Sequence, residues 1–491
     1  MLTLFKKNAL TVALIGTLSI LGGCSSDSND APELSGSRLV TVAENTTVVS
    51  QYTATDDDNR LTFAITGTDQ QLFAVNNTGA VEFISAPDFE NGDTGPYNIT
   101  VTVSDAQGLT DSIDVTVNVG DELDTPSMAL VQTIAADFSS SQVAYLDYAA
   151  QTVDDGFYAK TQSDYTISVY LNNVYHIGRF FIDTISKYIV LNASTEIWSY
   201  STQDDLDSTT RNPYTLVSLS AEKAYLIRYG SDKIWIVNPQ ATDFDSFKIG
   251  EINLASYVPD NNTAGTPSPS AAVVNDGKLF VVMQRLDDNF GSSNAVYLAV
   301  FDTVTDSEIE TNTDTSDSVM GIPLLGLNPL EHSVRAFEDK VYITSRDSFS
   351  AISVDQSLIE EVDTNDFSLS TVLSAADINN NTTKYIQSTA IVSAQQGYFY
   401  ATETFFGPYR EESTLYQFNP STGEISDETV LNIETNSIGF IDIDAAGFLW
   451  VSVREDATPG VEIIDTETNS PYINRLETQL NPGVIRFIEG F

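Results

Sequence analysis

The first quarter of the chain alternates hydrophobic and polar residues over short runs. Between Leu39 and Val119 these runs are RLVTVAEN, VVSQYTATD, LTFAITGT, FAVNNTGAVEFI, YNITVTVSD and DSIDVTVNV, and turn residues separate them. Alternation with a period of two is typical of strands that bury one face. Several short strands in succession, joined by turns, predict an antiparallel Greek-key β-sandwich.

Residues 127–491 show aromatic and β-branched runs rather than helical periodicity, and these runs repeat. The repeated strands are NVYHIGRF (173–180), KAYLIRYG (223–230), KLFVVMQRLD (278–287), KVYITSRD (340–347), GYFYATETFF (397–406) and GFLWVSVRED (447–456). Repeats of about 50 to 60 residues with about four strands each indicate the blades of a β-propeller. We therefore expect an all-β protein, a sandwich followed by a propeller.

Six blades are visible in this repeat, and a seventh requires both ends of the propeller region. The early strands QVAYLDY and GFYAK would pair with the closing GVIRFIEGF, which would fasten the ring. We favour seven blades over six or eight.

The chain begins with a secretory signal pattern. Lys6 and Lys7 precede an apolar run from Ala9 to Leu21, which is too short and too interrupted to suggest a membrane span. The following LGGC resembles the lipobox of bacterial lipoproteins, which implies lipidation of Cys24. Ser25 after the cysteine implies transfer to the outer membrane. We expect the anchored protein to be exposed at the cell surface, although the sequence leaves a periplasmic orientation open. The alternative is a plain secreted protein.

Cys24 is the only cysteine, so an internal disulfide is excluded. We expect four segments: a signal peptide (1–23), a lipidated acidic tether (24–32), the sandwich (33–126) and the propeller (127–491). With 22 Lys and Arg against 69 Asp and Glu, the net charge is −47, which makes nucleic acid and anionic membrane surfaces unsuitable partners. The acidity serves either solubility or the binding of divalent cations, and only particular spacings distinguish the two.

Acidic residues gather where the sandwich strands end. The stretches VAENT, ATDDD, PDFE, VSDAQG and VGDELDTP follow one another in the order and spacing of the cadherin repeat family, which this region resembles over about 95 residues. The tether stretch DSNDAP resembles the family's interdomain linker, placed before the domain. Leu123 stands where the second linker would carry an asparagine, and leucine cannot bind calcium.

The cadherin resemblance implies Ca²⁺ as a cofactor at the two poles of the sandwich. The upper set is Asn29, Asp30, Asp56, Asp58 and Asp105, with the backbone near Ala31. The lower set is Glu44, Asp88, Glu90, Asp121 and Asp124. Bound calcium would convert a flexible tether into a stiff stalk, because ligands from linker and domain would share one ion. The alternative for both sets is acidic loops on an acidic protein.

Five of the 12 arginines recur at one repeat position, the end of the second strand of a blade. These are Arg179, Arg228, Arg285, Arg346 and Arg454, and Tyr229, Gln284, Phe405 and Phe406 lie at equivalent places. We expect them around one mouth of the propeller, where guanidinium groups would bind carboxylate or phosphate. The equally weighted alternative is structural ion pairing with the adjacent acids Asp232, Asp287, Asp347 and Glu455.

The stretches RNPYTLVSLSAEKAYLIRYGSDKIWIVNP (211–239) and NDGKLFVVMQRLD (275–287) resemble bacterial surface propeller lipoproteins that capture a solute such as cobalamin. The resemblance implies a small-molecule ligand and transfer to a TonB-dependent outer-membrane transporter. The alternative function is a calcium-dependent adhesin that binds other cells or glycans.

No catalytic motif is visible, and we expect a binding protein rather than an enzyme. The two histidines, His176 and His332, lie in no metal-binding spacing, and neither a nucleophile elbow nor a glycine-rich phosphate loop is present. His332 either faces the pocket or packs and hydrogen-bonds locally, and we favour packing. A carboxylate-based glycosidase stays open, because 69 acidic residues hide any catalytic pair.

Overall fold

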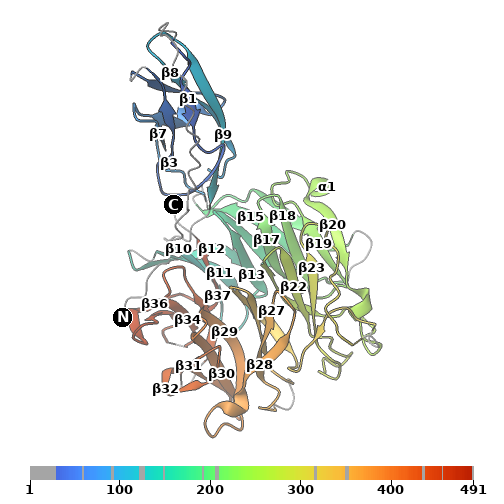
Figure 1. Cartoon of the computed structure of the whole chain (residues 1–491). Helices are drawn as coiled ribbons and strands as arrows, with labels where there is room; N and C mark the ends of the chain where they lie inside the picture. The colour runs from blue at the N-terminus through green and yellow to red at the C-terminus, as the bar shows by residue number, and fades with distance from the viewer. Residues whose placement is uncertain are drawn as a thin grey trace. The chain divides into compact units, whose positions relative to one another are not determined.

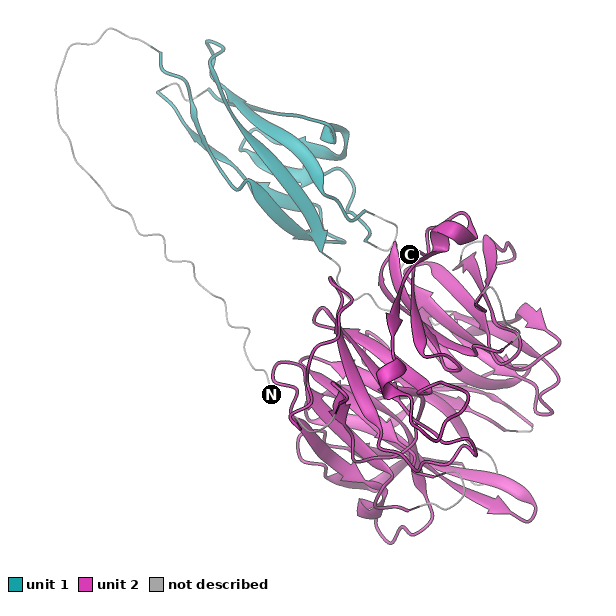
Figure 2. Cartoon of the chain, turned by 90° about the vertical axis from the view of Figure 1, so that its right-hand side faces the viewer, with its two compact units in different colours: residues 1–122 teal, residues 123–491 magenta. Residues whose placement is uncertain are grey.

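A computed structural model gives the structure of the protein and divides the chain into two compact units, residues 1–122 and 123–491 (Figure 2). The described residues are 29–57, 60–89, 93–120, 128–147, 150–190, 193–204, 209–314, 318–348, 353–433, 437–455 and 457–488. The boundary between the units lies a few residues before the one expected from the sequence. Each unit is described by itself.

Unit 1 is a β-sandwich. Its strands are β1 (Glu33–Ser35), β2 (Leu39–Ala43), β3 (Val48–Gln51), β4 (Thr53–Thr55), β5 (Thr62–Thr66), β6 (Phe73–Val75), β7 (Ala80–Phe83), β8 (Tyr97–Ser104) and β9 (Thr110–Gly120), with a 3-10 turn at Gln70–Leu72. One sheet has the order β2-β9-β8-β5, with β2 and β9 parallel, the second has β3-β7-β6, and β1 pairs with β4. The expected sandwich is confirmed.

The core of unit 1 follows from the alternation seen in the sequence. In β8 the side chains of Ile99, Val101 and Val103 are buried, whereas the intervening residues face outward. Strand β9 buries Val115 and Val117 in the same way. The two sheets therefore bury one face each, and the loops at the strand ends form the two poles.

Unit 2 is a β-propeller, and its described residues form seven four-stranded sheets (Figure 1). The first three blades after the closing blade are β13 (Tyr165–Tyr170), β14 (Asn173–Gly178), β15 (Thr184–Ile189) and β16 (Trp198–Ser201); β17 (Pro213–Ser220), β18 (Lys223–Arg228), β19 (Lys233–Val237) and β20 (Lys248–Asn253); and β21 (Pro269–Asn275), β22 (Lys278–Met283), β23 (Tyr297–Asp302) and β24 (Ile322–Pro323). The next three are β25 (Pro329–Phe337), β26 (Lys340–Ser345), β27 (Leu358–Asp363) and β28 (Leu369–Ser374); β29 (Tyr385–Ser393), β30 (Gln396–Phe406), β31 (Tyr409–Phe418) and β32 (Ile425–Ile433); and β33 (Ile438–Ile443), β34 (Leu449–Val453), β35 (Gly460–Asp465) and β36 (Ser470–Glu477).

The seventh sheet closes the ring with strands from both ends of the unit. Its order is β12-β11-β10-β37, built from β10 (Met128–Ile134), β11 (Ser141–Asp147), β12 (Thr152–Lys160) and β37 (Asn481–Ile488). Strand β37 is antiparallel to β10, with Ile485 opposite Val131. This is the closure expected from the sequence, so the propeller with seven blades is confirmed.

Each blade has one innermost strand, and these strands surround the central channel, because each contacts the innermost strands of both neighbouring blades. They are β13, β17, β21, β25, β29, β33 and, in the closing blade, β37. The second strands lie one position outward and are covered on both faces by adjacent blades. Strands β14, β18, β22 and β26 each begin with a half-buried residue and then bury every residue to their ends. Burial on both faces explains why these segments are nearly continuous apolar runs in the sequence.

Helical structure among the described residues is limited to short turns. They are the 3-10 turn Gln70–Leu72 of unit 1, α1 (Phe244–Phe247), in which the Asp243 side chain accepts from the Ser246 amide, and the 3-10 turns Ala255–Tyr257 and Ala375–Asp377. No helix in the described ranges has the length and hydrophobicity needed to cross a membrane. Cys24 and the leader lie outside the described residues.

Candidate functional site

A cavity of about 440 Å³ opens where the inner strands of the propeller begin. The lining residues are Gln132, Ile134, Tyr165, Thr166, Arg179, Tyr214, Tyr229, Gln284, Leu330, Glu331, His332, Gln387, Ser388, Tyr400, Glu411, Ile438, Gly439, Phe440, Arg454, Gly483 and Val484. Most belong to the first four residues of β13, β17, β25, β29, β33 and β37, and others directly follow the second strands. The cavity therefore collects equivalent positions from successive blades, and we call it the upper cavity.

One wall of the upper cavity is an ion-pair cluster centred on Arg179. Its Nε donates to Oδ1 of Asp164 at 2.6 Å, and Nη1 pairs with Oε2 of Glu331 from the bulged strand β25. Burial disfavours the charged form of Glu331, but Arg179 and His332 outweigh it and lower the pKa of Glu331 to about 2. Arg179 and Glu331 are therefore both ionised at neutral pH, and Arg179 is paired with two carboxylates, Asp164 and Glu331.

A large bulge in β25 delivers Glu331 and His332 into the channel. Pro329 pairs with Ser345 and Val334 with Ile343, so four residues of β25 lie opposite the single residue Thr344. His332 has a φ of 63°, in the left-handed region that non-glycine residues adopt uncommonly, although histidine adopts it more often than most. Strain of this kind is maintained by surrounding contacts and is common at binding sites.

A second wall combines tyrosine rings and side-chain amides. The rings of Tyr214 and Tyr229 stack at 4.5 Å between centroids, and the Arg179 guanidinium lies 5.4 Å from the Tyr214 ring. The Tyr229 hydroxyl donates to Oε1 of Gln284 at 2.7 Å, and Gln284 in turn donates to Oδ1 of Asn328 at 2.8 Å. This chain of contacts holds the aromatic rings in one orientation.

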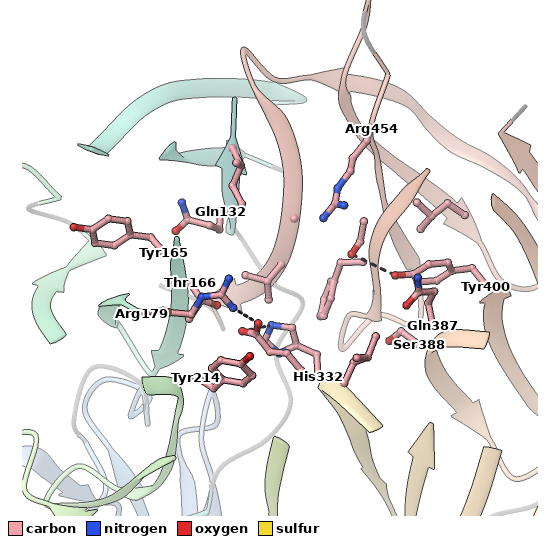
Figure 3. A pocket seen from close by; sticks show the side chains of 18 of the residues that line it. Gln132, Tyr165, Thr166, Arg179, Tyr214, His332, Gln387, Ser388, Tyr400 and Arg454 are labelled. Atoms are coloured by element: carbon pink, nitrogen blue, oxygen red, sulfur yellow. Dashed lines mark hydrogen bonds and ion pairs between the residues drawn. The ribbon is translucent and has the colours of Figure 1, made fainter. Parts of the chain in front are cut away.

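The guanidinium of Arg454 lies on the side of the cavity opposite Arg179, near Tyr400 (Figure 3). Its Nε donates to the carbonyl oxygen of Pro482 at 3.3 Å, and within the described ranges no carboxylate forms an ion pair with it. A Cβ at Gly439 would lie 2.7 Å from Nε of Arg454, so the absence of a side chain there makes room for the guanidinium. Arg454 is thus a half-buried cation with donors directed at a cavity.

The residues predicted for the propeller site divide into two groups. Arg179, Tyr229, Gln284 and Arg454 line the upper cavity, and each directly follows the second strand of its blade. Arg228, Arg285, Arg346 and Phe405 are not among the lining residues. The expected gathering of five guanidinium groups around one mouth is therefore corrected to two, Arg179 and Arg454.

The physical reason for two of these corrections is a register offset of one residue. Arg228 is the last residue of β18, one position before Tyr229, so its fully buried side chain points into the blade and stacks on Trp235 at 4.2 Å. Arg285 comes one position after Gln284 and donates to the carbonyl oxygens of Tyr257 and Ala295. Successive side chains of a strand point to opposite faces, so Arg228 turns into the core where Tyr229 faces the cavity. Arg285 lies beyond the end of β22 with a φ of 51°, and its half-buried guanidinium turns to these carbonyl oxygens instead of the cavity.

Aromatic contacts account for the remaining members of the predicted set. The Arg346 guanidinium lies 4.2 Å from the Tyr385 ring, the Arg410 guanidinium 3.8 Å from the Phe405 ring, and Phe406 is exposed. The ion pairs expected as the alternative also differ in their partners. Arg228 pairs with Asp204 rather than Asp232, and Glu455 pairs with Arg475.

The sequence prediction missed most of the inner-strand residues of the cavity. Tyr165, Tyr214, Glu331, Gln387 and Tyr400 were not singled out, and for His332 local packing was favoured, although it lines the cavity. For two of these inner strands, β17 and β25, the sequence does mark the place where the strand begins at the cavity. The dipeptide Asn-Pro opens β17 at 212–213 and β25 at 328–329, and in both the asparagine has a positive φ.

Two of the residues predicted to bind calcium at the upper pole of the sandwich, Asn29 and Asp105, are in contact. Nδ2 of Asn29 donates to Oδ2 of Asp105 at 2.6 Å, across 76 residues of sequence. Oδ1 of Asp105 accepts from the backbone amides of Gln107, Gly108 and Leu109, and the Asn29 bond followed by these amides lowers the pKa of Asp105. Asp30 is exposed and Asp56 is half-buried after β4, whereas Asp58 lies outside the described residues.

At the opposite pole, Glu44 is buried and its Oε2 accepts from the backbone amide of Phe89 at 2.6 Å. This bond brings Glu44 beside the loop that carries Asp88. The other predicted residues, Glu90, Asp121 and Asp124, lie outside the described residues. In the described part of the chain, no group of three or more His, Cys, Asp or Glu side chains is arranged to hold a metal ion.

Fold and site together define a protein with a β-sandwich and a seven-bladed propeller whose channel opens into a polar cavity. A model of the bacterial Ig domain matches residues 29–118. Ig-like and cadherin-like domains share the sandwich architecture, so the N-terminal unit is an Ig-like sandwich of the expected kind. No curated protein matches the chain.

Solved structures include propellers similar to unit 2. A provisionally assigned 6-phosphogluconolactonase from Bacteroides fragilis is 12% identical, with a TM-score of 0.48 and coverage of 75% of this chain and 100% of that chain. AztD from Citrobacter koseri is 12% identical, with a TM-score of 0.39 and coverage of 74% of this chain and 98% of that chain.

A cadherin structure is also similar to a part of the chain. Drosophila N-cadherin EC1-3 is 25% identical, with a TM-score of 0.17 and coverage of 19% of this chain and 35% of that chain. At these scores the fold assignment rests on the strand pairing of this chain.

Proposed function

We propose that the protein is a solute-binding lipoprotein in which the propeller captures a small polar molecule carrying an anionic group. An Ig-like sandwich joined to a propeller suggests a surface or solute-binding role in general. The observation that carries the narrower proposal is the Arg454 guanidinium, which faces the upper cavity without a carboxylate partner among the described residues.

The other lining groups support a ligand that is hydroxylated as well as anionic. Gln132, Gln387 and Ser388 add amide and hydroxyl groups, and four tyrosines contribute rings and hydroxyls. Arg179 is already neutralised by Asp164 and Glu331, so Arg454 is the group available for a carboxylate or phosphate of the ligand. Sugar acids and sugar phosphates have this combination of groups.

The proposed role of the N-terminal unit is that of a calcium-stiffened stalk between a lipidated Cys24 and the propeller. Supporting this, the tether residue Asn29 already contacts Asp105, whose second oxygen is oriented by three backbone amides. The oxygen and nitrogen of an asparagine amide are assigned from contacts, and a rotated Asn29 would offer oxygen to a cation instead. Asp56, Asp58 and Asp105 would complete the oxygen ligands that Ca²⁺ prefers.

Outer-membrane anchoring and delivery to a TonB-dependent transporter are part of the same proposal, and they rest on the LGGC pattern and the propeller resemblance. No catalytic step is included. His176 is buried between tyrosine rings, and burial lowers its pKa to about 3. His332 contacts Glu331 and Arg486, which makes it part of the cavity wall.

The propeller proposal is tested by thermal shift with neutral monosaccharides, the corresponding uronic acids and sugar phosphates. We expect one anionic class to raise the melting temperature of the full chain, by about 2–4 °C at a hundredfold excess over its Kd. Arg454→Gln should remove this shift, because the charge partner of the ligand is gone.

Arg285→Gln provides the matched control. It removes an arginine from the same repeat position, but one whose guanidinium contacts backbone carbonyls outside the cavity. Equal losses in Arg454→Gln and Arg285→Gln, or a shift unaffected by Arg454→Gln, would refute the assignment of the upper cavity.

A further inference from the structure

The hairpin of β30 and β31 is longer than the corresponding hairpins of the other blades. In each of those blades, the second strand from the channel ends opposite the first residue of the innermost strand. In this blade the equivalent residue is Thr402, opposite Tyr385, but β30 continues through 403–406 and pairs there with 409–412 of β31. The extension therefore projects beyond the face of the propeller at which the upper cavity opens.

This extension adds a carboxylate, Glu411, to the lining of the upper cavity. Glu411 lies opposite Thr404 in the extended part of the hairpin and is half-buried. Its Oε1 accepts a hydrogen bond from the Tyr409 hydroxyl at 3.0 Å. Among the described residues, no hydrogen bond or ion pair engages its second oxygen, so that oxygen is available to a ligand.

Two arginines near this hairpin have other contacts. Arg410 pairs with Glu412, and its guanidinium lies over the ring of Phe405. The Arg346 guanidinium lies 4.2 Å from the centre of the Tyr385 ring. Within the described ranges, neither guanidinium forms an ion pair with the carboxylate of Glu411.

Glu411 and Arg454 act on the same part of the cavity wall, around Tyr400. Figure 3 shows the Arg454 guanidinium and the Tyr400 ring on one side of the cavity. Burial raises the pKa of the Tyr400 hydroxyl, Arg454 lowers it and Glu411 raises it, so both charges lie within electrostatic reach of this group. In the described part of the chain no ion pair joins Glu411 to Arg454, which leaves each of them for a ligand group of opposite charge.

The charges of the lining offer no excess for a purely anionic ligand. Two guanidinium groups face two carboxylates, and these are Arg179, Arg454, Glu331 and Glu411. Asp164 adds a further carboxylate beside Arg179, and the whole chain has a net charge of −47. A pure anion would be attracted by Arg454 and repelled by Glu411, whereas a ligand that carries both charges would be attracted by both groups.

We propose that the upper cavity binds an amino sugar acid, whose carboxylate pairs with Arg454 and whose protonated amine pairs with Glu411. This inference rests on the solute-binding function proposed above and names its ligand class. A phosphate monoester fits less well, because it carries about two negative charges at neutral pH and would lie beside Glu411. A metal ion does not replace the amine, since the described residues contain no group of three or more metal-binding side chains.

The test is isothermal titration calorimetry of the full chain with glucuronic acid, glucosaminuronic acid and N-acetylglucosaminuronic acid. These compounds share the carboxylate and differ in the amine, which is absent, charged or neutralised. Glucosaminuronic acid should bind wild type at least about tenfold more tightly than the other two, because only its amine pairs with Glu411. Glu411→Gln should remove this preference without weakening the binding of glucuronic acid, because it removes only the carboxylate that repels an anion.

Glu412→Gln is the matched control, since it neutralises the next residue of the same strand, which pairs with Arg410. It should retain the preference for the amine, whereas Arg454→Gln should lose the binding of all three compounds. Equal affinities in wild type, or a preference that survives in Glu411→Gln, overturn the amine site and leave the solute-binding function standing. Binding of sugar phosphates without any of the three acids overturns the carboxylate assignment. If neither class binds, the solute-binding function itself is wrong.

Discussion

Arg179, Glu331 and His332 form a buried polar layer at the centre of the propeller, and its members depend on one another. Arg179 neutralises Glu331, and Glu331 in turn faces Nε2 of His332, which carries the proton of the neutral ring because Nδ1 accepts from Arg486. Removal of one partner from a buried ion pair leaves the other charge uncompensated, which is more damaging than the loss of an exposed pair. Arg179 keeps Asp164 when Glu331 is lost, whereas Glu331 has no other arginine as an ion-pair partner among the described residues, so the layer depends most on Arg179.

We predict that Glu331→Gln lowers the free energy of unfolding by roughly 3 kcal/mol at pH 7, as a fall of its pKa from an ordinary value of 4.5 to about 2 implies. The stabilisation by Glu331 is complete above the pKa of the unfolded chain and is lost as the pH falls from about 4.5 toward 2. Urea denaturation at pH 7 and pH 3 should therefore show a smaller difference between wild type and variant at pH 3.

Glu462→Gln serves as the control for this measurement, because its ion pair with Arg475 is half-buried on the outer strands. It should cost no more than about 1 kcal/mol. A pH-independent difference between Glu331→Gln and wild type would show that Glu331 is not the ionised partner of Arg179.

At the scale of elements, β37 has two functions. It supplies the inner strand of the closing blade through its pairing with β10, and it carries Gly483 and Val484 into the lining of the upper cavity. The bulge in β25 is the second element with a special role, since it turns Glu331 and His332 into the channel. Ring closure and site construction thus depend on the same inner strands.

Deletion of residues 481–491 should abolish the cooperative unfolding transition of the propeller, because β10 and β33 lose the strand that joins the last blade to the first. A chain ending at Ile488 should retain the transition, since β37 is then complete. Differential scanning calorimetry of both truncations measures this directly. A retained propeller transition in the longer deletion would contradict closure by β37.

At the scale of the whole molecule, the sandwich and the propeller have separate cores and separate candidate sites. Calcium should therefore act on one unfolding transition and a propeller ligand on the other. We predict that calcium, compared with chelator, raises the melting temperature of the sandwich, because it adds about 2.7 kcal/mol to the free energy of unfolding of this unit at a hundredfold excess over its Kd. The melting temperature of the propeller should stay unchanged.

The double variant Asp56→Asn/Asp105→Asn should lose the calcium shift, whereas Asp111→Asn should keep it, because Asp111 is bonded to the backbone amide of Leu34 rather than to the tether. A melt unaffected by calcium would remove both the stalk and the calcium-dependent adhesin. Calcium-dependent cell clumping that disappears on deletion of residues 31–121 would favour the adhesin over solute capture.

The sequence by itself determined the architecture. Alternation located the sandwich strands, and the recurring apolar runs located the blades and their closure, because burial on one face or on both leaves a local pattern. It also located the repeat position that borders the channel. Only the tertiary structure decided which residue at that position faces the cavity: Tyr229 rather than Arg228, and Gln284 rather than Arg285. An offset of one residue reverses the face of a strand, and a bulge such as that before Val334 breaks the alternation. Neither leaves a clear mark on the pattern of hydrophobic and polar residues.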